Sequence, residues 1–370
     1  MVLPCIDLVA GARPNFMKLA PVARALSIAG QVSFRIVHTG QHYDEAMAEV
    51  FFRDLGIPNP DVNLEVGSGS HGAQTARILE RYEAHLLSNR PNATVVFGDV
   101  NSTVACTLAA AKLLVPVAHV EAGLRSFDRT MPEEINRIVT DALADLLLVS
   151  EPSGVTNLRH EGIAESKIRL VGNVMIDTLM GQLEKAKERG AARRLGLEGL
   201  RYGLVTMHRP SNVDDPTILR RMLVLLRELS KELPLVFPVH PRTRQSVLKA
   251  GFGDLITAGQ TSFICLEPLP YLDLLSLAQG ATMVLTDSGG LQEETSILGV
   301  PCLTMRENTE RPITVEQGTS RLVGNNADKL RAAFREALAG KWGHGAGIPL
   351  WDGKAAGRIS QELASWLTRG

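Results

Sequence analysis

The sequence predicts an α/β protein built on two parallel sheets. Apolar strand segments alternate with helical segments of roughly ten to fifteen residues along the chain, which is the pattern of parallel βα units. The alternation restarts at Tyr202 after a charged helix, and 370 residues are enough for two large cores. Polar residues follow several strands directly, at the edge where ligands bind in open α/β sheets.

The first predicted sheet begins with a strand at 2–10 and a helix that starts near Pro14. Proline suits the first turn of a helix because the N–H that it lacks has no intrahelical partner there. Apolar residues at helical spacing run to about Ala29, and a second strand spans 32–38. Two later strands of this sheet are predicted at 93–98 and 116–120.

The second predicted sheet follows a boundary near Gly172. A helix rich in Lys, Glu and Arg, at about 177–194, leads to it. Its strands are predicted at 202–207, 235–239, 262–266, 282–286 and 301–305. Helices at about 328–339 and 355–368 close the chain, with a glycine-rich loop at 340–347 between them. We expect domains at 1–172 and 173–354, with the last helix (about 355–370) packed back on the first domain.

The octapeptide Asp-Ser-Gly-Gly-Leu-Gln-Glu-Glu, which follows the fourth strand of the second sheet, predicts a tight turn into a helix that runs to Leu298 and stops at Gly299. Ser288 suits the N-cap, and Gly289 and Gly290 let a ligand approach the backbone closely. Free N–H groups and the helix dipole favour an anion here, most naturally a phosphate. Glu293 and Glu294 suit hydrogen bonds to sugar hydroxyls, so we expect a nucleotide with a ribose.

The first sheet has a similar order of strand, polar residues and helix, although the helix and loop lengths differ. Asp99 follows the strand at 93–98, a helix opens at Asn101, and the next apolar run ends at Glu121. Both sheets therefore present polar residues at the carboxyl ends of their strands.

Charge and hydropathy narrow the classes of partner. The net charge is −1 and basic residues are scattered, which argues against nucleic acid as the main partner. No apolar run approaches the ~18 residues that a membrane span needs. The N-terminus lacks the basic region of a signal peptide and enters a strand directly.

The four cysteines lie singly in apolar segments, which is typical of buried thiols in a reducing compartment. We expect a cytoplasmic protein. The sequence has no C-x-x-C and no H-E-x-x-H, so we expect no metal site.

A glycine motif at 67–72 matches G-x-G-x-x-G and precedes a helical segment at 74–87. A dinucleotide site uses the first strand of a sheet and an acidic residue about 20 positions later. Here the preceding run is short and comes third, and positions 88–98 hold no carboxylate. A loop that gates the ligand site, or a plain surface loop, fits better, and we expect no NAD cofactor.

Each polar residue at a strand end also has an ordinary explanation. Asp99 suits a helix cap, Glu133 and Glu134 suit the first turn of a helix, and His208 is compatible with a plain strand end. Their joint occurrence at the carboxyl ends of two sheets is harder to explain by such ordinary structural roles. Cations and a helix N-terminus can hold a diphosphate while carboxylates surround the group attached to it.

Several segments of the sequence, which contain these residues, resemble the bacterial non-hydrolysing UDP-N-acetylglucosamine 2-epimerases. The likeness includes Gly-Asp-Val-Asn-Ser-Thr, His-Val-Glu-Ala-Gly-Leu-Arg-Ser and Met-Pro-Glu-Glu-Ile-Asn-Arg. In order, the resembling segments lie at 11–18, 39–43, 98–103, 119–126, 131–137, 172–177, 207–209, 239–240, 286–294 and 310–312. They span nearly the whole chain, so the resemblance is specific.

The resemblance implies a glycosyltransferase-B type fold, with two Rossmann-like domains facing across a cleft, and a homodimer. It also implies a UDP-sugar substrate, a role in surface polysaccharide synthesis, and no cofactor.

The resemblance further implies roles for individual residues. The family's acid/base carboxylates are matched by Asp99, Glu121 and Glu133. Its catalytic or diphosphate-side groups are matched by His208, Arg13 and Lys18. Its UDP-binding turn is matched by Ser288, Gly289, Gly290 and Glu294, with Arg311 beside it. Weaker matches are Arg209 and His240 for substrate binding and Gln41 and His42 for regulation by a second substrate molecule. Asn15 departs from the Glu of many members, which we interpret as subfamily variation.

The chemistry explains this residue set. The C2 hydrogen of UDP-N-acetylglucosamine has no adjacent carbonyl, so direct deprotonation is prohibitively slow. Loss of UDP builds positive charge at C1, acidifies the C2 proton and permits elimination to 2-acetamidoglucal. Re-addition of UDP, with a proton delivered to the other face, gives the N-acetylmannosamine epimer.

Several alternatives stay open at this stage. One is 2-epimerisation of another UDP sugar, such as UDP-2,3-diacetamido uronic acid. A hydrolysing epimerase, a glycosyltransferase and a UDP-sugar-binding regulator without turnover are the others.

Overall fold

The computed structural model describes residues 3–40, 56, 59–257, 262–343, 345 and 347–369; the side chains of Arg13 and Arg369 are outside this description. The chain divides into two compact units. Unit 1 comprises Met1–Met180 and Pro349–Gly370, and unit 2 comprises Gly181–Ile348. Helix α7 (Val174–Arg189) contains the division, so the sequence boundary at 172 lies just before this helix.

Unit 1 is a parallel sheet with helices on both faces. Its strand order is β3-β2-β1-β4-β5-β6-β7. The strands are β1 (Cys5–Ala10), β2 (Ser33–His38), β3 (Val62–Asn63), β4 (Ala93–Phe97), β5 (Val117–Ala122), β6 (Leu146–Val149) and β7 (Ile168–Leu170). Strands β1, β4 and β5 are neighbours, so their carboxyl ends meet at one edge.

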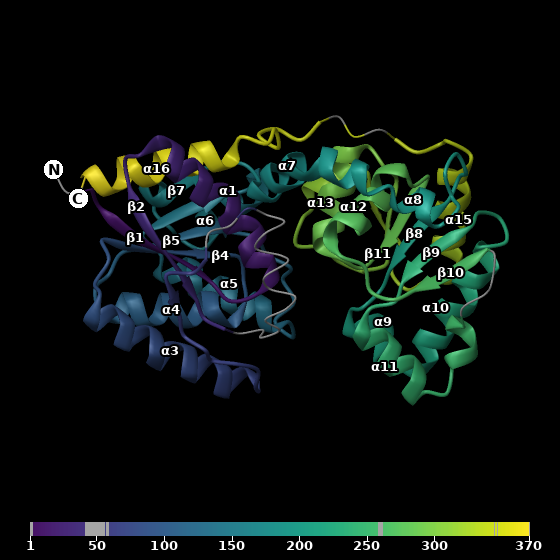
Figure 1. Cartoon of the computed structure of the whole chain (residues 1–370), viewed down its shortest axis with the longest axis horizontal. Helices are drawn as coiled ribbons and strands as arrows, with labels where there is room; N and C mark the ends of the chain where they lie inside the picture. The colour runs from purple at the N-terminus through teal and green to yellow at the C-terminus, as the bar shows by residue number, and fades with distance from the viewer. Residues whose placement is uncertain are drawn as a thin grey trace. The chain divides into compact units, whose positions relative to one another are not determined.

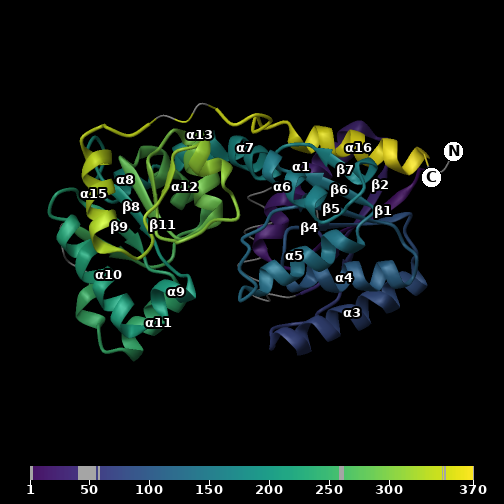
Figure 2. The same ribbon diagram turned by 180° about the vertical axis from the view of Figure 1, so that it is seen from behind.

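The helices of unit 1 form two layers (Figures 1 and 2). One layer holds α3 (His71–Ser88), α4 (Asn101–Lys112) and α5 (Pro132–Leu143). The other side carries α1 (Arg13–Ala29) and α16 (Ala355–Arg369), whereas Leu158 of α6 (Pro152–His160) belongs to the same core as α3 and α4. The core between sheet and α3–α4 is apolar and includes Val9, Val96, Ile78 and Ala109. Both faces of the sheet are therefore covered, as a parallel sheet requires.

Unit 2 repeats this plan with strand order β10-β9-β8-β11-β12-β13, all pairs being parallel. Its strands are β8 (Gly203–Thr206), β9 (Leu235–Pro238), β10 (Phe263–Leu266), β11 (Met283–Thr286), β12 (Cys302–Thr304) and β13 (Ser320–Leu322). Its helices are α8 (Ala191–Arg194), α9 (Pro210–Val213), α10 (Pro216–Leu229), α11 (Pro241–Lys249), α12 (Tyr271–Gly280), α13 (Gly289–Leu298), α14 (Ile313–Glu316) and α15 (Ala327–Leu338). Separate apolar cores lie under α10 with α15 and under α8 with α12.

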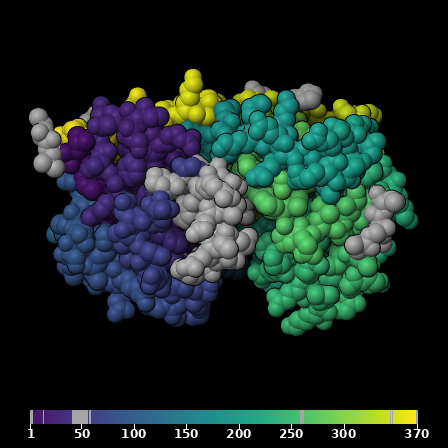
Figure 3. All heavy atoms as spheres, viewed as in Figure 1, coloured from purple at the N-terminus to yellow at the C-terminus, as the bar shows by residue number. Residues whose placement is uncertain are grey.

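The C-terminal helix returns to unit 1. Helix α16, yellow in Figures 1 and 3, packs against α1. Asp177 caps it, because its carboxylate accepts hydrogen bonds from the backbone N–H groups of Ala355 (3.1 Å) and Ala356 (2.8 Å). Arg358 donates to the Val171 carbonyl at 2.6 Å. These bonds tie the end of the chain to the segment at 171–177.

Three predicted elements differ from the structure. The charged helix predicted at 177–194 is two helices, α7 and α8, because Gly190 adopts a left-handed conformation (φ 57°) and breaks the run. The strand predicted to end at Val120 continues through Glu121 to Ala122. The helix after the glycine motif already begins at His71, with Ser70 as its N-cap. Within the described ranges, no helix is long and apolar enough to cross a membrane.

Candidate active site

Asp99 lies at the carboxyl edge of the unit 1 sheet, two residues after β4. Its carboxylate forms an ion pair with Arg137 of α5, and its side chain is 26% exposed. Asn136 holds the backbone of the same residue, since its amide donates to the Asp99 carbonyl at 2.9 Å. Two consecutive residues of α5 thus orient Asp99.

Glu121 lies beside Asp99, on the neighbouring strand β5. Its backbone is left-handed (φ 74°), and the β5–β6 register shifts between Val120 and Ala122. A non-glycine residue in this conformation costs about 1–2 kcal/mol. The bulge re-aims the side chain, which is buried and pairs with Lys18 at 2.5 Å (Nζ to Oε2). Backbone strain of this kind is typical of functional sites.

Lys18 reaches Glu121 because the start of α1 is fixed to the sheet. The Asn15 side-chain oxygen accepts hydrogen bonds from the N–H groups of Gly11 (3.3 Å) and Ala12 (3.1 Å), and its amide donates to the Phe97 carbonyl (2.6 Å). A Cβ atom at Gly98 would lie 2.6 Å from Lys18 Nζ. Asn15 is therefore a buried connector between the β1–α1 turn and β4, a role that the sequence did not indicate.

The structure distinguishes the adjacent glutamates Glu133 and Glu134. Glu134 is buried and accepts hydrogen bonds from the N–H groups of Ser126 (3.0 Å) and Phe127 (2.9 Å) and from Arg137. Burial would raise the pKa of Glu134, but these bonds and the Arg137 charge hold that pKa below its ordinary value. Glu133 is partly exposed, and no hydrogen bond or ion pair joins it to a described residue. Glu134 is a structural anchor, which leaves Glu133 available to a ligand.

Three predicted residues cannot be placed as side chains. Arg13 is the first residue of α1, and its side chain lies outside the described part of the structure. Gln41 and His42 also lie outside the described residues. Their regulatory role stays a prediction.

In unit 2, Asp287 organises the carboxyl edge of the sheet. It directly follows β11, is fully buried, and accepts hydrogen bonds from the backbone N–H groups of His208 (2.9 Å) and Arg209 (2.9 Å) and from the Asn212 amide (3.1 Å). His208 Nδ1 contacts the same carboxylate at 3.0 Å. Burial would raise the pKa of Asp287, but these contacts hold it below its ordinary value. The sequence indicated Asp287 as a strand-end residue without assigning it this role.

His240 contacts His208 through its ring. The two ring centroids are 5.1 Å apart, and His240 Nδ1 accepts a hydrogen bond from the Arg242 N–H at 3.2 Å. Burial lowers the pKa of His240, and the nearby His208 lowers it further. The acceptor role of Nδ1 assigns the ring proton of neutral His240 to Nε2.

The turn at Ser288 begins helix α13 as the sequence predicts, and the helix ends at Leu298. Ser288 occupies the N-cap position, but its side chain forms no capping hydrogen bond. A Cβ atom on Gly290 would meet nothing closer than Ser288 Oγ at 4.0 Å, whereas one on Gly289 would lie 2.8 Å from Glu310 Oε1. Gly290 is thus the glycine beside open space, and Gly289 is required by packing.

The expectation that Glu293 binds sugar hydroxyls is not supported, because its carboxylate pairs with the buried Arg311. Arg311 also contacts Glu310 at 2.8 Å, and Glu310 pairs with Arg306 at 2.8 Å. Burial would raise the pKa of Glu310, but these arginines lower it strongly. This network braces α13 from within the unit.

Glu294 and Arg209 differ from that buried network. The Tyr271 hydroxyl donates to Glu294 Oε1 at 3.0 Å. The Arg209 side chain is 27% exposed, and its guanidinium lies 4.0 Å from Glu310.

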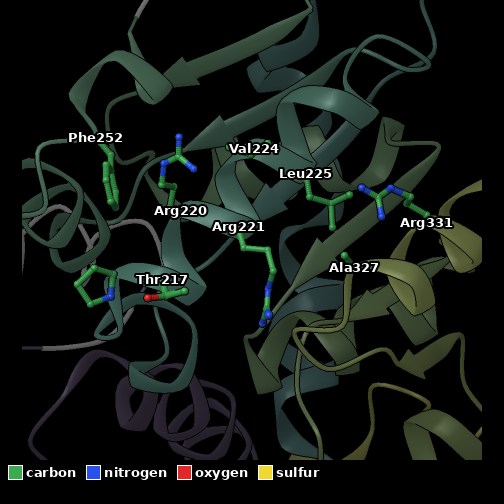
Figure 4. Close-up of a pocket in the computed structure, with 9 residues that line it drawn as sticks. Thr217, Arg220, Arg221, Val224, Leu225, Phe252, Ala327 and Arg331 are labelled. Carbon is green, nitrogen blue, oxygen red and sulfur yellow. The ribbon is translucent and has the colours of Figure 1, made fainter.

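A cavity of about 480 Å³ lies elsewhere on unit 2, beside α10 (Figure 4). Arg220, Arg221, Phe252 and Arg331 line it, and it includes none of the predicted site residues. Among the described residues, no group of three or more His, Cys, Asp or Glu side chains is arranged to hold a metal.

Two comparisons identify similar sequences. The family model described as UDP-N-acetylglucosamine 2-epimerase matches residues 24–364. A UDP-N-acetylglucosamine 2-epimerase of Methanocaldococcus jannaschii is 41% identical over 365 residues, which cover 97% of this chain and 98% of that protein. A UDP-2,3-diacetamido-2,3-dideoxy-D-glucuronate 2-epimerase of Pseudomonas aeruginosa is 41% identical over 358 residues, covering 96% and 98% respectively. The resemblance inferred from sequence is confirmed.

Solved structures support the same relationship. The M. jannaschii UDP-GlcNAc 2-epimerase in complex with UDP-GlcNAc and UDP has a TM-score of 0.88 at 41% identity, covering 99% of this chain and 100% of that one. WaaG, a glycosyltransferase involved in lipopolysaccharide biosynthesis, has a TM-score of 0.59 at 13% identity over 99% of this chain and 100% of its own, which shows the fold alone. The predicted fold class, two Rossmann-like domains of the glycosyltransferase-B type, is confirmed. A cleft between the domains stays a prediction.

Proposed function

Because this chain belongs to the UDP-N-acetylglucosamine 2-epimerase family, a family of isomerases, we propose that it interconverts UDP-N-acetylglucosamine and UDP-N-acetylmannosamine. One observation carries the proposal for this chain. Two carboxylates, Asp99 and Glu121, lie at the carboxyl ends of neighbouring strands of unit 1, where Asp99 contacts Arg137 and Glu121 contacts Lys18.

The proposed reaction is elimination followed by re-addition. A carboxylate removes the C2 proton while the C1–O bond breaks, and the C2–H electrons become the C1=C2 bond of 2-acetamidoglucal. UDP leaves with the bridging oxygen and the electrons of the broken bond. The oxygen then returns to C1 as a proton is added to the opposite face of C2. Atoms and charge balance without a net oxidation.

The proposed roles follow the two units. Asp99, Glu121 and Glu133 supply proton transfer, which is worth typically ~10²–10⁴-fold for each positioned group. Lys18, Arg13 and His208 stabilise the departing diphosphate. In unit 2, the N-terminus of α13 at Ser288–Gly290 offers backbone N–H groups to the UDP phosphates, with Glu294, Arg209, His240 and Arg311 around it.

Proton NMR with UDP-N-acetylglucosamine in deuterated water, without added NAD, tests the proposal. Formation of the epimer with deuterium at C2 supports it. Release of free sugar would indicate a hydrolysing epimerase, and tight binding of UDP without any turnover would indicate a regulator.

A second candidate substrate is a UDP-2,3-diacetamido uronic acid. The P. aeruginosa relative, named for such a sugar, is 41% identical to this chain, the same identity as the M. jannaschii relative. Parallel assays with both sugars decide between them, since the preferred substrate has the larger kcat/KM.

The proposal also includes the cellular compartment, the pathway and the oligomeric state. We propose a homodimer that acts in the cytoplasm and supplies surface polysaccharide synthesis. All four cysteines are free thiols, in agreement with a reducing compartment. Sedimentation equilibrium of the purified protein tests the dimer, and a monomer across the assay concentrations would reject it.

A further inference from the structure

A fully buried imidazole connects the two carboxylate-bearing segments of unit 1. His119 of β5 and Asp141 of α5 have no exposed surface, and His119 Nδ1 lies 2.6 Å from Asp141 Oδ1. On its other side, His119 Nε2 lies 2.8 Å from the carbonyl oxygen of Gly98, the residue before Asp99.

Asp141 holds the other side of the strained bulge. Its second oxygen accepts a hydrogen bond from the Gly123 N–H at 3.0 Å, two residues after Glu121, and pairs with Arg125 at 2.7 Å. The Gly98 N–H donates to the Val120 carbonyl at 3.0 Å. One chain of contacts thus runs from the Asp99 loop, through His119 and Asp141, to the backbone beyond Glu121.

Both ring nitrogens of His119 face acceptors. A carbonyl oxygen can only accept, so Nε2 donates to Gly98. Burial would raise the pKa of Asp141, but the charges and hydrogen bonds of His119 and Arg125 hold it below its ordinary value. Asp141 faces the other ring nitrogen, so the imidazole is held from both sides, by the Gly98 carbonyl and by the Asp141 carboxylate. Glu161 binds Arg125 at 2.7 Å and extends this set of contacts to the end of α6.

We propose that His119 and Asp141 are a positioning pair that holds Asp99 and the strained Glu121 in register for proton transfer. The inference rests on the proposed function, since these carboxylates are assigned the proton transfers there. Displacement of a reacting group by about 1 Å can cost about 100-fold in rate. A pair that fixes both backbone segments at once therefore controls kcat without touching the substrate.

Three variants test the pair. His119→Leu removes both hydrogen bonds, whereas His119→Gln keeps a side-chain amide that can donate to Gly98. The matched control is His85→Leu, because His85 is also buried and pairs with an aspartate, Asp7, at 3.0 Å, toward the beginning of β1. All three lose a buried histidine, but only His119→Leu loses the contact with Gly98.

We expect His119→Leu to lower kcat per folded protein about 100-fold with KM changed less than about threefold, and His119→Gln to recover at least about tenfold of that loss. His85→Leu lowers the thermal midpoint and leaves kcat per folded protein within about threefold of wild type. Equal kcat for His119→Leu and His85→Leu would overturn the proposal, and so would equal losses in the Leu and Gln variants at position 119.

Nitrogen-15 NMR of the wild-type imidazoles gives an independent measurement if His119→Leu does not fold. A proton on Nε2 of His119 supports the hydrogen bond to the Gly98 carbonyl, and an Nε2 without a proton overturns the pair. A wild-type protein that exchanges no C2 proton in either UDP sugar rejects the proposed function instead, and the NMR signal then decides on the pair alone.

Discussion

The carboxyl edges of the two sheets have similar topology, but their carboxylates are stabilised in different ways. In unit 1, Asp99 contacts Arg137 and Glu121 contacts Lys18, and the Glu121 backbone is held at φ 74°. In unit 2, Asp287 is fully buried and is satisfied by two backbone N–H groups, an amide and His208.

This difference indicates a division of labour. A carboxylate that faces a side-chain cation can exchange that partner for a substrate, whereas one enclosed by backbone donors can only organise its surroundings. Unit 1 thus presents groups suited to chemistry, and unit 2 presents a rigid frame for an anion at the start of α13. The following substitutions test that distinction.

The largest effect is expected for Glu121→Gln. The substitution preserves shape but removes the charge that pairs with Lys18 and the capacity to take up a proton. We expect kcat to fall by about 10²–10⁴-fold while UDP affinity changes little, because the nucleotide is assigned to unit 2. Deuterium exchange at C2 and calorimetric titration with UDP measure the two quantities. A comparable loss of UDP affinity would contradict the assignment of proton transfer to unit 1 and of nucleotide binding to unit 2.

Asp287→Asn is expected to act mainly on stability. The amide cannot accept every hydrogen bond now made to the buried carboxylate, so the free energy of unfolding should fall by about 3 kcal/mol in urea at pH 7. An unchanged unfolding free energy would show that Asp287 does not organise this edge.

The same variant has a defined pH dependence. The pKa of Asp287 is lowered in the folded protein, where burial raises it less than His208, Arg209 and Asn212 lower it. Its stabilisation is therefore complete above the unfolded-chain pKa of about 3.9 and is lost as the pH falls through the lower folded value. The difference between wild type and variant should shrink as urea unfolding is repeated from pH 6 towards pH 3.

The adjacent glycines of α13 separate packing from ligand access. Gly289→Ala places a Cβ atom 2.8 Å from Glu310 Oε1, so it should lower the free energy of unfolding by about 1–3 kcal/mol. Gly290→Ala meets no such atom and gains helix propensity, so its stability should rise by up to about 1 kcal/mol. UDP affinity should nevertheless fall about tenfold in the Gly290 variant, a loss of about 1.4 kcal/mol. Unchanged affinity would place the nucleotide elsewhere.

The smallest stability effect is expected for Ser288→Ala. A serine that caps a helix typically contributes about 1 kcal/mol, but Ser288 forms no such bond, so the change should stay below about 0.5 kcal/mol. A fall in UDP affinity with unchanged stability would support a role of Ser288 in binding UDP. A fall of about 1 kcal/mol in the free energy of unfolding, as expected for a serine that caps a helix, would contradict the geometry of this turn.

The sequence predicted the fold class well because its signals were local. The helix after Ser288 begins and ends where the turn residues and Gly299 indicated, since N-caps and left-handed glycines act within a few residues. The break of the charged helix at Gly190 was missed, because a glycine inside a charged helical pattern does not by itself reveal a left-handed conformation.

The candidate site was predicted less completely. Strand-end position and the family resemblance were sufficient to select Asp99, Glu121 and Lys18. They did not reveal that Arg137 orients Asp99, that Asn15 joins the β1–α1 turn to Phe97, or that Arg311 is occupied by Glu293. These contacts join residues from different elements, and no local pattern encodes them.

By itself, the sequence determined two parallel α/β sheets, the family, and the strand ends to which we assign the chemistry, because periodicity, turn residues and motif order are properties of neighbouring residues. Only the tertiary structure showed that Glu134 is a buried anchor, placed His119 between Gly98 and Asp141, and put Glu121 in a left-handed bulge. The physical reason is that burial and hydrogen-bond partners depend on which elements pack together, and the same carboxylate is an anchor or a reactive group according to what surrounds it.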